Sequence, residues 1–312
     1  MRKFLLQLFW FGLPVLFIFG FLEYKISAIP NDLSYKRVLL EAALPKIEVL
    51  ITGASDSFMG INPQYFSKVG FNLAFHSQSL IIDTQLVRKY FDRMPRLQLI
   101  IMSINYATPS YKMSDSDESR RNFLYSRFFG IRGDQSVLSL LHPQNYFAFM
   151  NYGSNQIREF IEKKFKVNLA SETSASGWSK SETIGNAQVI TVATGKKLVL
   201  FHDRLMKSEH IPDNLKALDD LLSYAAPKDV KIVFVTPPVF NTYSSLMNLD
   251  VWQKEKTLIR NLAQKHNTFY YDFLTDSRFE ISDFKDDNHL NFKGAEKLSQ
   301  ILEVDVVRPN TK

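Results

Sequence analysis

Two short segments near opposite ends of the chain hold residue types that together can perform nucleophilic catalysis. Ser55 lies in a turn after an apolar run, and His289 lies three residues after Asp286, just before the last predicted helix. A serine hydroxyl becomes a nucleophile when a histidine takes its proton and a carboxylate orients that histidine. The spacing predicts that Asp286 binds one ring nitrogen of His289 while the other faces Ser55. Asp283 and Asp287 leave the choice of carboxylate open.

Each of these residues also has an ordinary structural interpretation. Taken alone, Ser55 is more simply a serine in a loop or at a helix start, because the triplet Gly-x-Ser is common. The alternative for His289 is a surface histidine near a helix start, with Asn288 or Asn291 as the cap, and the coincidence of all the motif residues favours the site over it. The interpretation as a site therefore depends on the two segments occurring together.

Segments so far apart in sequence can meet only in a folded core, and the chain alternates predicted strands with predicted helices. Strands are predicted at residues 47–52, 71–75, 97–104, 230–235 and 268–273. Helices are predicted at residues 62–68, 79–92, 213–224, 251–266 and 292–302. This alternation predicts an α/β fold with a buried parallel sheet and helices on both faces. Ligands of such sheets bind at the carboxyl ends of the strands, where Ser55 and Asn105 fall.

The alternation breaks down over residues 107–196, which are predicted to be an insertion over or beside the site. The Ser-rich middle of this insertion, residues 171–181, is predicted to be a mobile loop. The length of 312 residues and the hydrophobic content of 45% suit one α/β domain with an insertion.

An apolar segment at the amino terminus predicts a membrane anchor. Residues 4–22 contain no charge and as a helix would span roughly 28 Å at ~1.5 Å per residue, about the thickness of a bilayer core. Arg2 and Lys3 precede this run, so the positive-inside tendency places the amino terminus in the cytoplasm. A cleaved signal peptide is the alternative, but the run is longer than the ~7–15 residues of a signal core, and no clear small-x-small cleavage site follows.

The expected domain organisation follows from this anchor. We expect a membrane anchor at residues 1–24, a stalk at 25–45 and a globular domain at 46–312, exported to the periplasm or the cell exterior.

Composition excludes several classes of function. The chain has no cysteine, so disulfides, lipid-modified cysteines and thiolate metal sites are excluded. The net charge of +6 is spread along the chain without a long basic block, which favours solubility beside an anionic surface over nucleic-acid binding. His202 and His210 flank Asp203 but lack the tight spacing of metal ligands, so neither a metal nor another cofactor is expected. His76 follows the second predicted strand and could line the cleft.

Four blocks of the chain resemble the SGNH (GDSL-type) hydrolases, in which a serine, a backbone glycine, an asparagine and an Asp-x-x-His pair follow one another along a flavodoxin-like sheet. The blocks are residues 53–55, 71–74, 103–106 and 286–289. The likeness covers most of residues 46–304 outside the insertion. The run that begins at Gly53 is also similar to membrane-anchored SGNH proteins associated with bacterial surface-polysaccharide loci, and more distantly to DltD.

This resemblance implies a flavodoxin-like three-layer fold and a role for each block. Ser55, His289 and Asp286 would be the catalytic triad, and the oxyanion hole would combine the backbone N–H groups of Ser55 and Ala74 with the side-chain amide of Asn105. Among the departures from the family pattern, alanine stands at position 74, where a glycine is common.

The resemblance also implies a function. We expect transfer of an acyl group, with acetyl as the expected group, to a cell-envelope polysaccharide, or hydrolysis of its esters, through a serine acyl-enzyme. Esterase and transferase both stay open, because they differ only in the hydroxyl that takes the acyl group. For a transferase, the family implies a membrane-bound O-acyltransferase partner that passes acyl groups across the membrane. The alternative is a non-catalytic glycan-binding or assembly protein on an SGNH scaffold.

Overall fold

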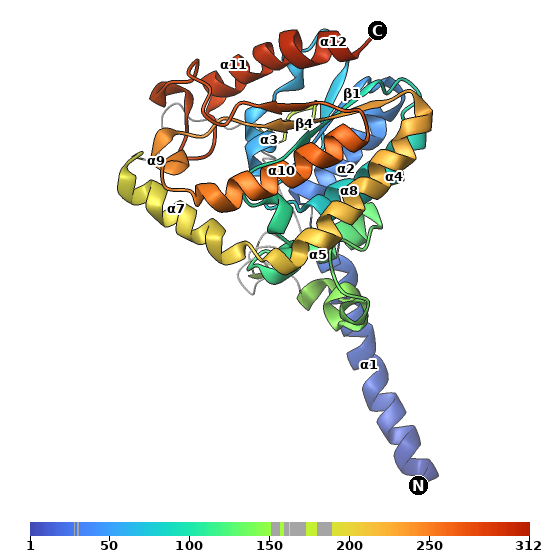
Figure 1. Ribbon diagram of the computed structural model, residues 1–312. Helices are drawn as coiled ribbons and strands as arrows, with labels where there is room; N and C mark the ends of the chain where they lie inside the picture. The colour runs from blue at the N-terminus through green and yellow to red at the C-terminus, as the bar shows by residue number, and fades with distance from the viewer. Residues whose placement is uncertain (28, 30, 151–156, 159–161, 163–172, 180–188) are drawn as a thin grey trace.

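Five parallel strands form one sheet at the centre of the protein (Figure 1). The computed structural model describes residues 1–27, 29, 31–150, 157–158, 162, 173–179 and 189–312. The strands are β1 (Val49–Thr52), β2 (Gly70–Asn72), β3 (Leu99–Ser103), β4 (Lys231–Thr236) and β5 (Tyr270–Asp272). Their order in the sheet is β2-β1-β3-β4-β5, the order of flavodoxin-like folds. The predicted α/β fold with a flavodoxin-like parallel sheet is therefore confirmed.

The sheet is buried on both faces, as its nearly continuous apolar strands predict. Every residue of β1 and β3 is buried, and alternate residues enter two separate cores. Leu50 and Ile100 belong to the larger core, whereas Ile51 and Ile101 belong to the smaller one. Strand alternation thus divides the interior into the two halves that the helices cover.

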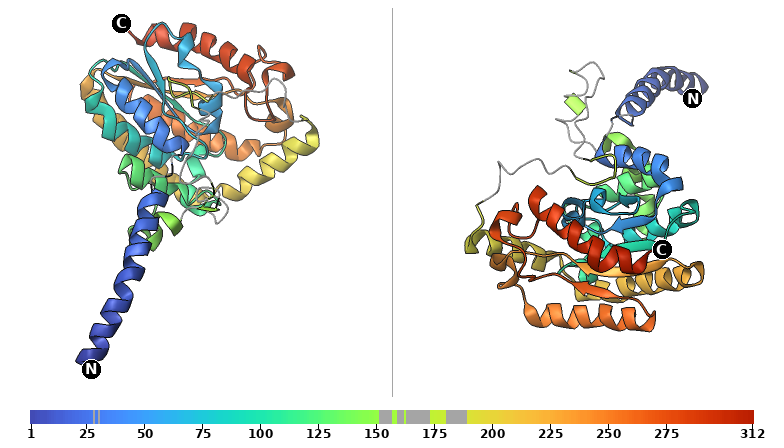
Figure 2. Two further views of the ribbon diagram at one scale, coloured as in Figure 1. Left: turned by 180° about the vertical axis from the view of Figure 1, so that it is seen from behind. Right: turned by 90° about the horizontal axis from the view of Figure 1, so that it is seen from above.

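Helices cover both faces of the sheet, as Figures 1 and 2 show. The larger core is closed by α2 (Asp32–Ala43), α4 (Leu80–Tyr90), α8 (Ile211–Ala225) and α10 (Leu249–Lys265). The smaller core is closed by α11 (Phe292–Leu302) and the turn that leads into α12 (Arg308–Asn310). The remaining α-helices of the globular part include α3 (Ser55–Gly60), α5 (Arg121–Leu124), α7 (Val192–Leu205) and α9 (Asn241–Ser244).

Residues 25–45 are not the stalk that the sequence suggested. Most of this segment forms α2, which begins with a capping box in which Asn31 and Ser34 each bond the backbone of the other. Leu33 and Leu40 of α2 are buried in the larger core. The helix is therefore a layer of the α/β domain, and the domain begins a few residues after the apolar segment.

A fully buried lysine ties α2 to the loop after β2. The Lys36 ammonium donates a hydrogen bond to the carbonyl oxygen of Ala74 and lies 3.9 Å from the centre of the Phe58 ring. Burial lowers the pKa of Lys36 well below its usual value, and the nearby Asp32 opposes this effect. A buried lysine therefore belongs to the segment that the sequence predicted to be a stalk.

The described part of the Ser-rich segment is docked on the sheet. Residues 173–179 form an isolated antiparallel bridge, and Ser176 accepts a hydrogen bond from the Asn72 N–H at the edge strand β2, with an N···O distance of 2.8 Å. Gly177 has a φ of +81°, and an added Cβ would lie 2.2 Å from the Asn72 carbonyl oxygen. The expectation of a mobile loop does not hold for these seven residues; the rest of residues 171–181 lies outside the described residues.

The amino-terminal helix α1 (Arg2–Ser27) projects away from the α/β domain (Figure 1). Of the residues that the structure describes, α1 is the one helix that is long and apolar enough to cross a membrane. Its aromatic and aliphatic side chains are mostly exposed in the isolated chain. This exposure fits a helix whose surroundings are hydrocarbon.

The docking of α2 can be tested by truncating one buried side chain. We expect Leu40→Ala to lower the free energy of unfolding by about 2–5 kcal/mol, because a fully buried leucine leaves a cavity. Val38→Ala on the exposed side of the same helix should change it by less than about 0.5 kcal/mol. Denaturant unfolding of both variants measures the difference; equal small effects would mean that α2 is a detached stalk.

Candidate active site

The turn after β1 places Ser55 at the carboxyl edge of the sheet. Gly53 has a φ of +138°, and an added Cβ would lie 2.5 Å from the Cβ of Ser103 on β3. Glycine is therefore required where β1 ends, since a side chain would collide with the neighbouring strand. The chain reverses at Ala54, and Ser55 is the first residue of α3.

The structure brings Ser55, His289 and Asp286 together. The Oγ of Ser55 lies 2.7 Å from Nε2 of His289, and Nδ1 of His289 lies 2.9 Å and 3.0 Å from the two carboxylate oxygens of Asp286. Both His289 and Asp286 are largely shielded from solvent. This hydrogen-bonded series has the geometry in which a histidine can take the serine proton while a carboxylate orients the ring.

The loop that holds Asp286 and His289 is itself closed by backbone pairing. Phe284 and Leu290 form an antiparallel bridge, and one oxygen of Asp286 accepts hydrogen bonds from the N–H groups of Asn288 at 3.1 Å and His289 at 2.9 Å. These two hydrogen bonds fix the orientation of the carboxylate independently of its contact with the imidazole. Burial alone would raise the pKa of Asp286, but the hydrogen bonds and charge of His289 and these N–H groups outweigh burial and hold it below its usual value.

The neighbouring carboxylates have other partners. Asp287 accepts a hydrogen bond from the Thr242 hydroxyl, and Asp283 forms an ion pair with Lys297. Of the three candidates, the structure thus places Asp286 against the histidine.

Asn291, which the sequence offered as a helix cap, does cap α11 by accepting a hydrogen bond from the Gly294 N–H at 3.0 Å.

Asn105 lies at the end of β3 on the wall of the cavity that contains Ser55. Its side-chain oxygen accepts hydrogen bonds from the N–H groups of Ala107 and Thr108, both at 3.0 Å, and from the Thr108 hydroxyl at 2.9 Å. These bonds fix the orientation of the amide. Its amino group has no protein partner among the described residues, so it is a donor available to a ligand.

The structure does not bring Ala74 to the site. Ala74 is fully buried, its N–H donates to the side-chain oxygen of Asn72 at 3.0 Å, and its carbonyl oxygen accepts from Lys36. A backbone donor committed in this way cannot serve an oxyanion. The assignment of Ala74 to the oxyanion hole is therefore corrected, because the loop after β2 runs further before it reaches the cavity.

Ser77, three residues after Ala74 in the same loop, reaches the cavity. It lines the same cavity as Ser55 and Asn105 and has a φ of +54°, in the left-handed region that favours glycine. No hydrogen bond that the structure describes uses its N–H. Sequence reasoning missed this residue because a serine carries no signal for a positive φ.

The cavity beside Ser55 is small and mostly apolar, with a volume of about 90 Å³. Its polar lining includes Ser55, Ser77, Asn105 and Asn288. Its apolar lining includes Ala107, Phe201, Leu205, Val239 and Leu274. Since α7 supplies Phe201 and Leu205, part of the wall comes from a helix at the end of the predicted insertion.

A second histidine, His202, lies close to the triad and was not recognised as part of the site from the sequence. It is on α7, lines the cavity, and its Nδ1 lies 2.5 Å from the hydroxyl of Tyr243. Burial, and to a smaller extent the charge of His289, lower the pKa of His202 to about 4, while Asp286 opposes both effects. At neutral pH this ring is therefore uncharged and forms part of the cavity wall.

The acid beside the serine is turned toward the sheet. Asp56 is buried, and its Oδ2 accepts a hydrogen bond from the Ser103 hydroxyl at 2.7 Å. This bond directs the carboxylate toward β3 and accounts for an acidic residue next to Ser55.

One buried carboxyl connects two loops of the site. Asp83 on α4 accepts hydrogen bonds from the Gly53 N–H at 3.0 Å and from the Gln78 side-chain amide at 2.6 Å. Burial raises the pKa of Asp83 to about 7, although both hydrogen bonds lower it. Asp83 thereby joins the turn before Ser55 to the loop that contains Ser77.

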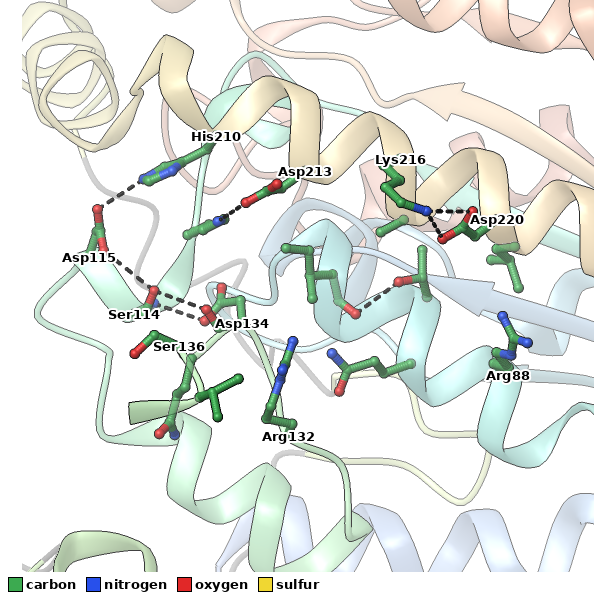
Figure 3. A pocket seen from close by; sticks show the side chains of 18 residues that line it. Arg88, Ser114, Asp115, Arg132, Asp134, Ser136, His210, Asp213, Lys216 and Asp220 are labelled. Carbon is green, nitrogen blue, oxygen red and sulfur yellow. Dashed lines mark hydrogen bonds and ion pairs between the residues drawn. The ribbon is translucent and has the colours of Figure 1, made fainter. Parts of the chain in front are cut away.

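A larger cavity, of about 630 Å³, lies between α4 and α8, away from the serine (Figure 3). Its lining includes charges of both signs, and several are already paired. Lys112 binds Asp213 at 2.7 Å and Lys216 binds Asp220 at 2.8 Å. None of the five site residues expected from the sequence lines this cavity.

One cluster near that cavity has residue types suited to a metal ion. Single ligand atoms of Asp115, Glu209 and His210 lie within 4.8 Å of one another. However, Asp115 already accepts hydrogen bonds from Lys207 at 2.6 Å and from His210 at 2.9 Å. An ammonium in contact with the carboxylate explains this cluster as an ion-pair network.

Comparison with known proteins adds little to this geometry. No protein-family model and no curated protein matches the chain. Among solved structures, the chain is similar to a proposed acylhydrolase from Bacteroides fragilis, with 10% sequence identity and a TM-score of 0.40. The likeness covers 91% of this chain and 97% of that one. So distant a likeness carries no argument about function, which must be argued from the site.

The buried Asp83 predicts a pH-dependent stability. Its folded pKa of about 7 lies above the usual 3.8, so between these values the folded chain keeps a proton that the unfolded chain releases. The stabilisation is therefore present at low pH and is lost as the pH rises toward 7 and beyond, by an amount on the order of a few kcal/mol.

Asp83→Asn should remove this dependence, because an amide oxygen still accepts from Gly53 and Gln78 but does not titrate. Denaturant unfolding of both proteins from pH 4 to 8 measures it. We expect the stability of the wild type to decline relative to the variant as the pH rises. If the unfolding free energies of the two proteins changed in parallel with pH, the pH dependence would not come from Asp83.

Proposed function

We propose that this protein is a membrane-anchored serine enzyme of the SGNH type that transfers or hydrolyses acyl groups. The observation that carries the proposal is the hydrogen-bonded series from Ser55 through His289 to Asp286, opening into a cavity with the Asn105 amide at its wall. A serine, a histidine and a carboxylate hydrogen-bonded in this order are the arrangement that activates a nucleophile through a general base. Satisfying ordinary buried polar groups does not require this order.

In the proposed mechanism, His289 takes the proton of Ser55 as the serine oxygen attacks the ester carbonyl carbon. The carbonyl oxygen becomes an oxyanion, which the N–H groups of Ser55 and Ser77 and the amino group of Asn105 would stabilise. The intermediate collapses as the bond to the leaving alcohol breaks, and His289 returns its proton to that alcohol. Ser55 then carries the acyl group, while Asp286 keeps the imidazole oriented and stabilises its charged form.

The second half of the reaction repeats these steps with a new hydroxyl. Water would release the acid, whereas a sugar hydroxyl would receive the acyl group, and His289 would deprotonate either of them. In both cases the serine regains its proton and the enzyme is restored. The chemistry at Ser55 is thus the same for an esterase and an O-acyltransferase.

The size of the cavity supports a short acyl group. A volume of about 90 Å³ has room for an acetyl or a similarly small group and not for a fatty acyl chain. Apolar side chains of Leu205 and Leu274 line it, as an acyl methyl group requires. We therefore propose acetyl as the transferred group.

The membrane anchor supports the choice of acceptor. A helix able to span a bilayer, in which Arg2 and Lys3 precede the uncharged run, favours a domain outside the cytoplasm, where envelope polysaccharides are accessible. The resemblance to anchored SGNH proteins of surface-polysaccharide loci, and more distantly to DltD, points to the same acceptor. As a transferase the protein would receive acyl groups from a membrane-bound O-acyltransferase, since no acyl thioester pool is expected outside the cytoplasm.

The proposed nucleophile can be tested with a fluorophosphonate probe on the full-length protein in detergent. We expect Ser55→Ala to abolish labelling, and His289→Ala and Asp286→Asn to slow it by at least roughly 10³-fold. Ser57→Ala is the matched control, because it removes a buried hydroxyl from the same helix α3. Wild-type labelling in Ser55→Ala would contradict the proposal, and a well-folded wild type that stays unlabelled would favour a non-catalytic glycan-binding protein.

The role of Asn105 can be separated from its structural role. Asn105→Asp keeps an oxygen that accepts from Ala107 and Thr108 but loses the amino donor, whereas Asn105→Ala loses both. We expect each variant to lower kcat for a small acetyl ester by about 10²–10³-fold. Only Asn105→Ala should also lower the melting temperature. Full activity in Asn105→Asp would remove this side chain from the oxyanion hole.

A further inference from the structure

A cluster of exposed apolar side chains lies beside the upper end of α1. It belongs to residues 137–150, which contain three short 3₁₀ turns: Leu138–Leu141, Pro143–Asn145 and Ala148–Met150. The exposed apolar side chains are those of Val137, Leu138, Leu141, Tyr146, Phe147 and Met150. Leu138 and Leu141 are 79% and 74% exposed. So many large apolar groups on one short segment indicate a surface that is covered by something other than water.

The segment packs directly on the apolar helix. The ring of Phe19 on α1 contacts those of Phe147 and Phe149 edge to face, with centroid distances of 5.8 Å and 5.1 Å. Phe19 precedes Leu22, the last residue of the uncharged run, by about 4.5 Å along the helix axis at ~1.5 Å per residue. If the uncharged run spans the hydrocarbon core of the bilayer, Phe147 and Phe149 lie at the boundary of that core.

The backbone N–H groups at the carboxyl end of this segment are paired within the protein. From Asn145 to Met150, each of the six consecutive N–H groups donates to an acceptor within the protein. Four bond to carbonyl oxygens of the segment itself, and those of Ala148 and Phe149 bond to the carboxylate of Glu23 on α1. A segment that faces water has no need of such complete pairing, whereas one that enters a lipid layer does.

The contact between α1 and the domain continues beyond Glu23, at the carboxyl end of the helix. Ile26 and Ile29 are buried against Phe123 and Ala148, and the Arg127 guanidinium donates to the carbonyl oxygen of Ser27 at 3.2 Å. The junction is thus packed and hydrogen-bonded on both sides of Glu23. The segment is held in a fixed position relative to the helix.

We propose that residues 137–150 enter the interfacial layer of the membrane leaflet next to the domain, so that the protein contacts the bilayer through a second element besides α1. The yellow-green segment lies along the upper end of α1 in Figure 1. Lipid is the occupant that this surface fits, because it continues the lipid-facing surface of α1 at the same depth. Tyr24 and Tyr146, both exposed, supply the aromatic rings that favour the interface between water and hydrocarbon.

This inference is independent of the proposed enzymatic function, and the absence of cysteine makes it directly testable. The full-length protein in lipid vesicles would carry one cysteine at a time, in Leu138→Cys, Leu141→Cys or Val304→Cys. Val304 is 57% exposed and lies between α11 and α12, which are at the end of the domain opposite α1 in Figure 1, so it is the matched exposed apolar control. Phe17→Cys on α1 gives the rate for a lipid-covered position.

The reaction rate with a charged, water-soluble maleimide is the readout. We expect Leu138→Cys and Leu141→Cys to react at least roughly 10-fold more slowly than Val304→Cys in vesicles, and equally fast after denaturation. A fluorophore on Leu141→Cys should also be quenched by bromine on the lipid chains. Reaction as fast as at position 304 overturns the proposal. Protection that disappears when the protein is diluted with excess lipid also overturns it, since the covering surface would then be a second copy of the chain.

Discussion

The close approach of β1 to β3 at Gly53 is the constraint on which the site depends. Only a residue without a side chain lets the chain pass Ser103 and turn sharply enough to present Ser55 at the sheet edge. The N–H of that glycine is held by the buried carboxyl of Asp83, which also holds the loop 76–78 through its glutamine. The position of the serine and that of the neighbouring backbone donor are therefore set by one group, and neither can shift alone.

A second polar group extends this arrangement to the edge of the sheet. Asn72 is fully buried at the end of β2, and its amino group donates to the carbonyl oxygens of Ser57 at 2.8 Å and Ile61 at 2.7 Å. Its side-chain oxygen accepts from Ala74. The asparagine thus fastens the helix that begins with the serine to the edge strand, in an interior where unpaired groups would be costly. Rigidity of this kind suits a site that must keep three side chains in register.

The sequence predicted the sheet well because its strands are apolar runs buried on both faces. It singled out Ser55, Asp286 and His289 by their types and order, and the structure brings these side chains within hydrogen-bond distance of one another. It misplaced the loop donor at Ala74, since spacing alone does not show how far a loop extends before it turns back. It missed His202 because α7 packs on the site only through tertiary contacts. It predicted a stalk at residues 25–45, and it could not show that Lys36, a residue type that is rarely buried, lies in the core.

The junction at Glu23 has a mechanical consequence. A domain on a flexible linker sweeps a hemisphere around its attachment point and meets its partners at many heights and angles. Here the Glu23 carboxylate of α1 accepts hydrogen bonds from the backbone N–H groups of Ala148 and Phe149, so the helix and this part of the domain change tilt together. The junction therefore restricts the height and the orientation of the opening beside Ser55 relative to that helix. A molecule that binds there has to reach the site from this height, so the shape of the molecule becomes part of the selection.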